Sequence, residues 1–117
     1  MAMMYEGVNE VRLVGKICYI PTLKEAHGHK YLRTLVVVKE NQGVYGEPKK
    51  IKTYRPLMFL DDFAQKMKPN LKVGMLVYVY GRLNHYYVNE NFRMSDVIVQ
   101  KISILAKENP EDVEGKR

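Results

Sequence analysis

Residues 49–70 have the sequence KKIKTYRPLMFLDDFAQKMKPN, in which a strand pattern is followed directly by a helix pattern. Polar and apolar side chains alternate over most of residues 49–60, which is the period of a β-strand whose two faces meet different surroundings. Pro56 lacks a backbone N–H, so we expect its part of the strand to lie at a sheet edge or a bulge. This segment therefore predicts one strand that leads into a helix without a long connection.

The helix is predicted to begin at Asp61 or Asp62, since either carboxylate can cap a helix start. Asp62 and Gln65 also resemble a capping box. Pro69 ends the pattern, which leaves a helix of only about two turns. A helix this short depends on packing against a sheet rather than on its own propensity.

Outward from this segment, alternating and β-branched residues predict four more strands, at residues 8–20, 30–40, 75–88 and 92–105. Residues 22–29 are polar and include Gly28, so we expect a loop there. Residues 41–48 contain two glycines, an asparagine and a proline, and are predicted to form a long hairpin loop. The expected order is three strands, one short helix and two strands.

This order predicts an all-β OB-fold, a five-stranded barrel with its helix between strands 3 and 4. An open sheet would leave its edge strands exposed, so a closed or partly open barrel is favoured. We expect residues 7–106 to form this domain, residues 1–6 to be a flexible N-terminus and residues 107–117 to be a disordered polar tail. The length of 117 residues is that of a single domain.

Charge and aromatic content indicate the class of partner. The chain has 19 Lys and Arg and 13 Asp and Glu, a net charge of +6. The last twelve residues hold three of the basic and four of the acidic groups, so residues 1–105 carry +7. Nine Tyr and three Phe accompany these charges. Basic groups interleaved with aromatic rings are what single-stranded nucleic acids bind.

Catalytic, metal and membrane chemistry find little support. The single cysteine, Cys18, excludes an internal disulfide and a multi-cysteine zinc site. His27, His29 and His85 do not have the spacing of a zinc site. The sequence has no phosphate-binding glycine loop, no signal peptide and no apolar run long enough to cross a bilayer. We therefore expect a cytoplasmic protein that is not an enzyme and uses no cofactor or metal.

The third predicted strand carries the strongest candidate site. Alternation places Lys50, Lys52 and Tyr54 on one face, where the ammonium groups attract phosphates and the ring stacks on a base. The alternative is a solvated strand face with one exposed tyrosine. Rings in the two long hairpins are equally compatible with binding and with packing. The full candidate set for nucleic-acid binding is Lys16, Arg33, Tyr45, Lys49, Lys50, Lys52, Tyr54, Tyr86, Tyr87, Phe92 and Arg93.

Several segments resemble bacterial-type single-stranded DNA-binding proteins. Residues 11–17, VRLVGKI, are similar to the V-x-L-x-G-x-L opening of that family, and Gly7-Val8-Asn9 also resembles its start. Residues 53–59, TYRPLMF, resemble its third strand. Residues 72–74 and 77–83, KVG and VYVYGRL, resemble its KG and V-x-V-x-G-R-L block. The resemblance covers residues 7–105 and rests on the order and spacing of these motifs together.

The resemblance implies an OB-fold that wraps single-stranded DNA, commonly as a homotetramer. Tyr54 matches a base-stacking aromatic position of the family, and Leu60 stands where another ring often lies. The family's ring in the last hairpin corresponds to Tyr87 or Val88, of which Tyr87 is the better match. The implied function is sequence-tolerant binding in DNA replication, recombination or repair.

Three departures from the family modify these expectations. The chain has no Trp, no long Gly/Gln-rich linker and no acidic tip ending in Pro-Phe that recruits partners. It therefore resembles a short phage-borne or plasmid-borne version, or a primosome-type relative. The alternative function is an OB-fold accessory module that binds replication proteins and contacts DNA weakly. The residues leave DNA and RNA both open, and Met75–Tyr80 is predicted to be an edge strand that pairs between copies in a dimer or tetramer.

Overall fold

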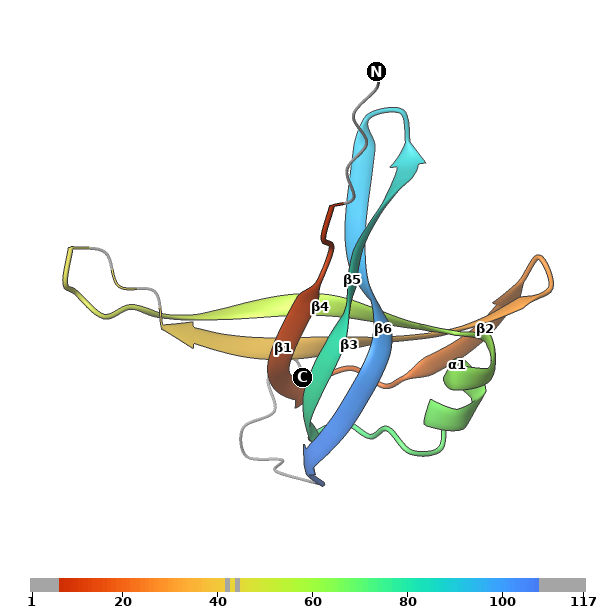
Figure 1. Cartoon of the computed structure of the whole chain (residues 1–117), viewed down its shortest axis with the longest axis horizontal. Coiled ribbons are helices and arrows are strands. Elements are labelled where there is room, and N and C mark those ends of the chain that lie inside the picture. The colour runs from red at the N-terminus through yellow and green to blue at the C-terminus, as the bar shows by residue number, and fades with distance from the viewer. Residues whose placement is uncertain (1–6, 42, 44, 108–117) are drawn as a thin grey trace, which may run out of the picture.

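A computed structural model describes residues 7–41, 43 and 45–107. Within them the order is β1 (Val11–Ile17), β2 (Thr22–Ala26), β3 (His29–Asn41), β4 (Lys50–Leu60), α1 (Asp61–Met67), β5 (Leu76–Asn89) and β6 (Phe92–Ala106) (Figure 1). The expected N-terminal segment, residues 1–6, lies outside the described residues, as does the tail from residue 108 onward.

The all-β OB-fold is confirmed, as a barrel closed by five strands. The sheet order is β1-β5-β6-β4-β3-β2, and β1 also pairs with β3, where Lys16 lies opposite Val37. The β4–β6 pair is parallel and joins Leu57 to Val97. Strand β2 pairs only with β3 within the described residues, so it extends the sheet outside the barrel.

The prediction of a plain loop over residues 22–29 is wrong for most of that segment. Thr22–Ala26 forms β2 and pairs with β3 from Thr22 opposite Arg33 to Ala26 opposite His29. All five β2 residues are exposed, so no apolar alternation signals the strand in the sequence. The tight turn at His27 and Gly28, both with positive φ, joins the two strands.

Strand β5 is a central strand, which corrects the expectation that Met75–Tyr80 is an edge. Val77 pairs with Gly15 of β1 on one side and with Ile104 of β6 on the other. An OB-fold barrel places this strand between the first and the last strand, so both of its edges are paired. Its backbone hydrogen bonds are therefore used inside the barrel.

Helix α1 follows β4 without a capping side chain, which corrects the predicted Asp cap. Leu60 takes the N-cap position in an extended conformation, and Asp61 is the first helical residue with φ 51°. The Asp61 carboxylate instead accepts a hydrogen bond from the Lys30 backbone N–H at 3.3 Å and lies 3.2 Å from His29 Nδ1. Asp61 thus ties the helix start to β3 rather than capping it.

The core fills the barrel and continues under α1. Phe59 is fully buried and meets Phe63 of the helix edge-to-face, with ring centroids 5.2 Å apart. Ala64 and Met67 supply the buried side of α1. The other large, fully buried apolar side chains of this core are Ile17, Leu32, Val36, Leu57, Val77 and Val79, and Val37 is buried with Cys18 in a second cluster.

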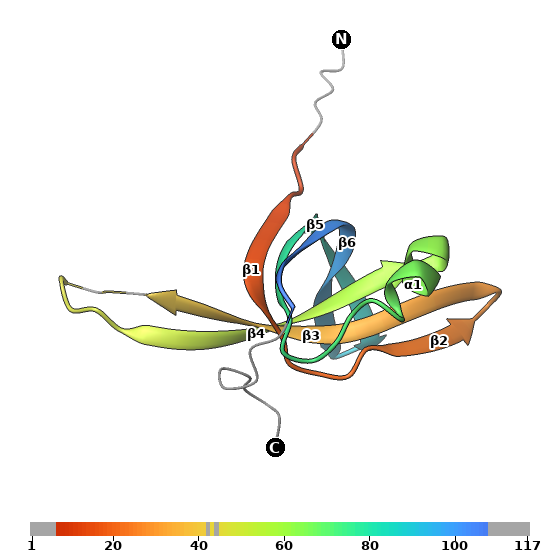
Figure 2. The same cartoon turned by 90° about the horizontal axis from the view of Figure 1, so that it is seen from below.

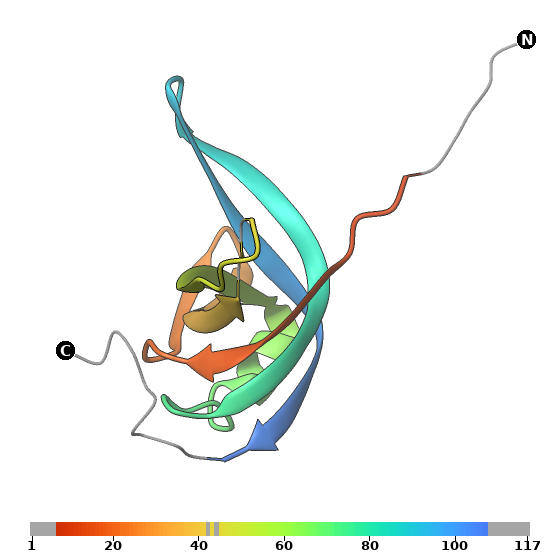
Figure 3. The ribbon, with the colours of Figure 1, turned by 90° about the vertical axis from the view of Figure 1, so that its left-hand side faces the viewer.

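Two β-hairpins that project from the barrel in Figure 1 frame the site described below, and Figure 2 shows the β3–β4 hairpin from below. The ribbon arm is the outer part of the β3–β4 pair, Val38–Asn41 with Lys50–Thr53. The hairpin arm is the outer part of the β5–β6 pair, Asn84–Asn89 with Phe92–Asp96. Figure 3 looks along the ribbon arm and shows β5 and β6 curving around the barrel before they rise into the hairpin arm.

Candidate nucleic-acid interface

The continuous register between β3 and β4 creates a face that points away from the core. Tyr31 pairs with Leu60 and Asn41 with Lys50, with no shift between them, so Pro56 keeps the register. Directly opposed residues share a face and alternate residues face the same way. The ribbon face therefore consists of Arg33, Leu35, Val37, Lys39 and Asn41 from β3 with Lys50, Lys52, Tyr54, Pro56 and Met58 from β4.

The structure brings Lys50, Lys52 and Tyr54 onto this one face. Lys50 and Lys52 are exposed, and the Tyr54 side chain is 43% exposed. Pro56 lies before the first residue of β4 that pairs with β6, so that part of the strand has an open edge, as its sequence predicts. Tyr54 thus presents a ring to solvent on a backbone that β3 holds in place.

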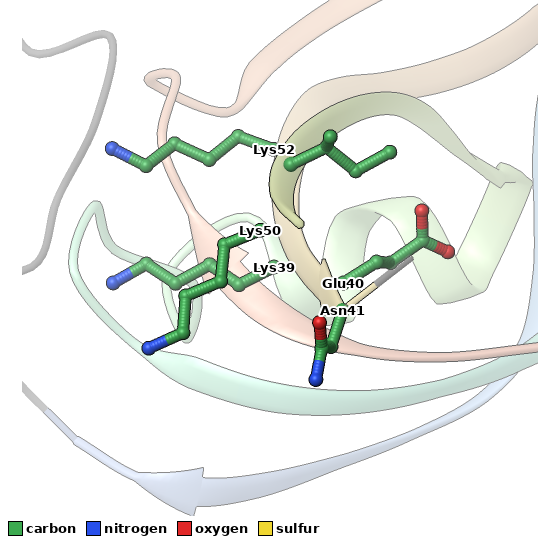
Figure 4. A pocket seen from close by; sticks show the side chains of 6 residues that line it. Lys39, Glu40, Asn41, Lys50 and Lys52 are labelled. Carbon is green, nitrogen blue, oxygen red and sulfur yellow. The ribbon is translucent and has the colours of Figure 1, made fainter. Parts of the chain in front are cut away.

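Lys39 adds a third ammonium group that the sequence analysis did not include. It lies directly opposite Lys52, and both line a hollow of about 370 Å³ together with Glu40, Asn41, Lys50 and Ile51. In Figure 4 the amino groups of the three lysines point to the same side, away from the Glu40 carboxylate. The alternation of residues 30–40 marks Lys39 as outward, but only the register places it beside Lys52.

Lys16 reaches the same face from the barrel closure. It is opposite Val37 on β3, and Val37 is opposite Tyr54 on β4, so the three side chains form one row across three strands. Val37 is buried beside Cys18, and burial raises the pKa of the Cys18 thiol. In this row the buried Val37 side chain therefore lies between the exposed Tyr54 ring and the Lys16 ammonium group.

Arg33 is held by contacts within the protein. Its Nη2 donates a hydrogen bond to the Tyr86 hydroxyl at 3.0 Å, and the guanidinium lies 5.9 Å from the centre of that ring. Arg33 also lies 3.8 Å from Asp96 Oδ2, whose side chain is 1% exposed. Asn84 Nδ2 donates to the other Asp96 oxygen at 3.2 Å. These contacts tie the base of the hairpin arm to β3, and neither Asp96 nor Asn84 was recognised from sequence.

The hairpin arm separates the aromatic residues expected to act together. Tyr86 is opposite Met94 and faces β3, whereas the neighbouring Tyr87 is opposite Arg93 on the other face of the arm. Tyr87 is 70% exposed and Phe92, near the turn, is 55% exposed. The face of the hairpin arm that contacts Arg33 therefore includes Tyr86 but not Tyr87.

The eleven residues predicted to bind nucleic acid lie in three parts of the structure. Six residues lie on the ribbon face or against it, namely Lys16, Arg33, Lys50, Lys52, Tyr54 and Tyr86. Tyr45 and Lys49 are exposed in the connection between β3 and β4, and Tyr45 has φ 57°. Tyr87, Phe92 and Arg93 lie on the outer part of the hairpin arm.

A second aromatic and basic cluster lies on the outer surface of β1, β5 and β6. Arg12, Tyr80 and Lys101 form a row across the three strands, and the Arg12 guanidinium lies 5.5 Å from the centre of the Tyr80 ring. Tyr80 donates a hydrogen bond to Glu10 at 3.0 Å, which raises the pKa of the Tyr80 hydroxyl. Glu10 offsets part of the positive charge here, in contrast to the ribbon face.

No three His, Cys, Asp or Glu side chains among the described residues lie close enough together to hold a metal ion. No helix in the same part of the chain has the length and apolar character needed to cross a membrane.

Comparisons with known proteins agree with this architecture. Residues 8–106 match the model of the single-strand binding protein family. A search of curated proteins found no significant match. Among solved structures, the Plasmodium falciparum SSB in complex with ssDNA is similar with a TM-score of 0.75 and 19% identity, over 88% of this chain and 99% of that chain.

Two structures of the single-stranded DNA binding protein from Thermus aquaticus are also similar. The wild-type protein has a TM-score of 0.74 and 21% identity over 86% of this chain, and a deletion mutant has 0.76 and 20% over 87%. The match covers 52% of each Thermus chain, so this chain spans about half the length of that protein. At these identities the structural likeness shows a shared fold.

Proposed function

The chain belongs to the single-strand binding protein family, and from that premise we propose that it binds single-stranded DNA without sequence preference across the ribbon face. The observation that carries the proposal is the charge of that face. Its ten described positions include Arg33, Lys39, Lys50 and Lys52 and no carboxylate, and Lys16 joins them from β1. Lysines arranged in this way neutralise phosphates whatever the base sequence.

Tyr54 supplies the complementary contact in this proposal. Its exposed ring is in the same row as Lys16, and Lys52 is two residues away on the same face. A base stacked on an aromatic ring contributes about 1–3 kcal/mol, and every base has such a surface. The ribbon and hairpin arms on either side extend this face, as loops do in other OB-folds.

The first experiment is a fluorescence titration with oligo-dT at low and at high salt. We expect tight binding at low salt that weakens steeply as salt rises. Tyr54→Ala is expected to lower the affinity about 5- to 150-fold, whereas Tyr54→Phe keeps the ring and the affinity. Weak binding at low salt, or binding independent of salt, would refute the proposal.

The same titration with matched RNA tests the sugar preference, because stacking and phosphate contacts alone do not distinguish the two. We propose that the DNA oligomer competes more strongly, in keeping with the family. The role proposed for the cell is protection and presentation of single strands during replication, recombination or repair. Replication proteins are the proposed partners, and copurification with them is the corresponding test.

We further propose that the chain assembles into a homo-oligomer. Val11–Gly15 of β1 pairs only with β5 within the described residues, so the other edge of that segment is open. Val14, on the outer surface of this sheet, is 49% exposed. Light scattering coupled to gel filtration, with and without oligo-dT, measures the assembly, and a strictly monomeric mass under both conditions would refute it.

A further inference from the structure

The ribbon face continues past Arg33 into a second hollow that the sequence did not predict. Strand β2 carries the face onward, because Thr22 lies opposite Arg33 and Lys24 lies opposite Tyr31. Thr22, Lys24 and Arg33 line a hollow of about 440 Å³ together with Tyr19. The hollow was hidden from sequence reasoning because it depends on the pairing of β2, which the sequence presents as a loop.

The backbone around Tyr19 is fixed although its side chain is free of the core. Thr34 Oγ1 donates a hydrogen bond to the Tyr19 carbonyl at 2.6 Å, and the Cys18 N–H donates to the Leu35 carbonyl at 2.9 Å. Lys68 Nζ donates to the Pro21 carbonyl at 3.0 Å. The Tyr19 side chain itself is 58% exposed. An aromatic side chain on an ordered segment loses little freedom when a base stacks on it.

The surroundings of this ring match the chemistry of the ribbon face. Lys24 is exposed on β2, and its neighbour Glu25 falls on the opposite face by alternation. Val37, opposite Tyr54, is four residues along β3 from Arg33, which is about 13 Å at 3.3 Å per residue. One extended strand of nucleic acid that runs along β3 can therefore contact both Tyr54 and the hollow beside Arg33.

From these observations we infer that Tyr19, Thr22 and Lys24 form a second contact site for the same nucleic-acid strand, in which Tyr19 stacks on a base and Lys24 contacts a phosphate. The bound strand then follows β3 from the ribbon arm to β2, instead of ending near Tyr54. This inference rests on the proposed function and adds the path of the strand.

The test uses two lengths of oligo-dT, about 5 and about 15 nucleotides, near the two ends of the range that an OB-fold covers. Tyr19→Ala is expected to lower the affinity for the long oligomer about 5- to 150-fold and to leave the affinity for the short oligomer unchanged. Tyr19→Phe keeps the ring and is expected to bind both lengths like the parent. Lys24→Gln is expected to reduce the salt slope for the long oligomer by about 0.7.

Lys66→Gln is the matched control for the charge change, since Lys66 is exposed on α1, away from this face. Each variant is also melted thermally. No change is expected for Tyr19→Ala, because only the backbone carbonyl of Tyr19 makes the hydrogen bond described. If Tyr19→Ala binds the long oligomer like the parent, the second site is refuted while the proposed function stands. If the parent binds neither length, both are refuted.

Photocrosslinking of the unmodified chain identifies directly which tyrosines contact the bound oligomer. An oligomer that carries 5-iodo-deoxyuridine is irradiated in the complex, and the protein is digested with trypsin. Residues 17–24 form one tryptic peptide with Tyr19 as its only tyrosine, and residues 53–66 form another with Tyr54 as its only tyrosine. We expect adducts on both peptides with the long oligomer. Adducts on residues 53–66 without any on residues 17–24 would overturn the inferred path.

Discussion

The three lysines of the ribbon arm allow a quantitative test of the proposed phosphate contacts. Lys39 and Lys52 are opposite one another, Lys50 is two residues along the same face, and all three amino groups point to one side (Figure 4). For single strands, each phosphate neutralised contributes about 0.7 to the slope of log affinity against log salt. Replacing all three lysines with Gln should therefore make the slope shallower by about 2.

This change in slope has a measurable consequence for affinity. Between about 50 and 200 mM salt, a slope difference of about 2 corresponds to about a 16-fold change in the ratio of the parent's affinity to the variant's affinity. The variant should thus be much weaker than the parent at low salt and closer to it at high salt. Fluorescence titration with oligo-dT at four or more salt concentrations measures both slopes.

The control removes the same charge from elsewhere. Lys66, Lys101 and Lys107 are exposed on α1, on β6 and just after β6, and their replacement with Gln lowers the net charge equally. If the control lowers the slope as much as the ribbon-arm variant does, total charge and not the ribbon face governs binding. An unchanged slope in the ribbon-arm variant would show that these lysines contact no phosphates.

Three further predictions concern the scaffold. Arg33→Met leaves the buried Asp96 carboxylate without its cation and should cost about 1–3 kcal/mol in urea unfolding; adding Asp96→Asn should recover part of this, and strictly additive losses would argue against coupling. Gly15→Ala places a methyl group 2.4 Å from the Val37 carbonyl, so it should destabilise the chain by about 1–3 kcal/mol, and an unchanged melting temperature would disprove the close approach. Burial raises the pKa of Cys18, so at pH 8 less of it is thiolate than in free cysteine, and an aromatic disulfide reagent should react slowly until urea exposes it; reaction at the rate of free cysteine would contradict this.

Much of the fold was predictable because alternation and helix position are local signals. The strand from Lys50 to Leu60 and the helix that follows it lie where their sequence predicts. Strand β2 was missed because its stability comes from backbone pairing with β3, and none of its five side chains is buried. The Asp61 cap was wrongly predicted because the carboxylate has a better partner on β3, which no local pattern reveals.

The candidate site was predictable along one strand and unpredictable across strands. Alternation alone grouped Lys50, Lys52 and Tyr54. Lys39 joins them only through the register between β3 and β4, which the sequence does not determine. Arg33 illustrates the same limit, since it was expected only to bind nucleic acid and the structure places it against Tyr86 and Asp96 from distant strands.

The alternation along β3 has a consequence for how this protein can be redesigned. Val36 belongs to the core and Val37 to the outer face, so the two kinds of position are interleaved one by one along the same strand. A combinatorial library restricted to the exposed outer end of this set, Lys39 and Asn41, would vary affinity while Val36 and the buried Val37 stay constant. A single inserted residue within β3 would exchange the two sets at once, since a one-residue slip turns every side chain to the other face. Variation among descendants of this sequence should accordingly be rich in substitutions here and poor in insertions.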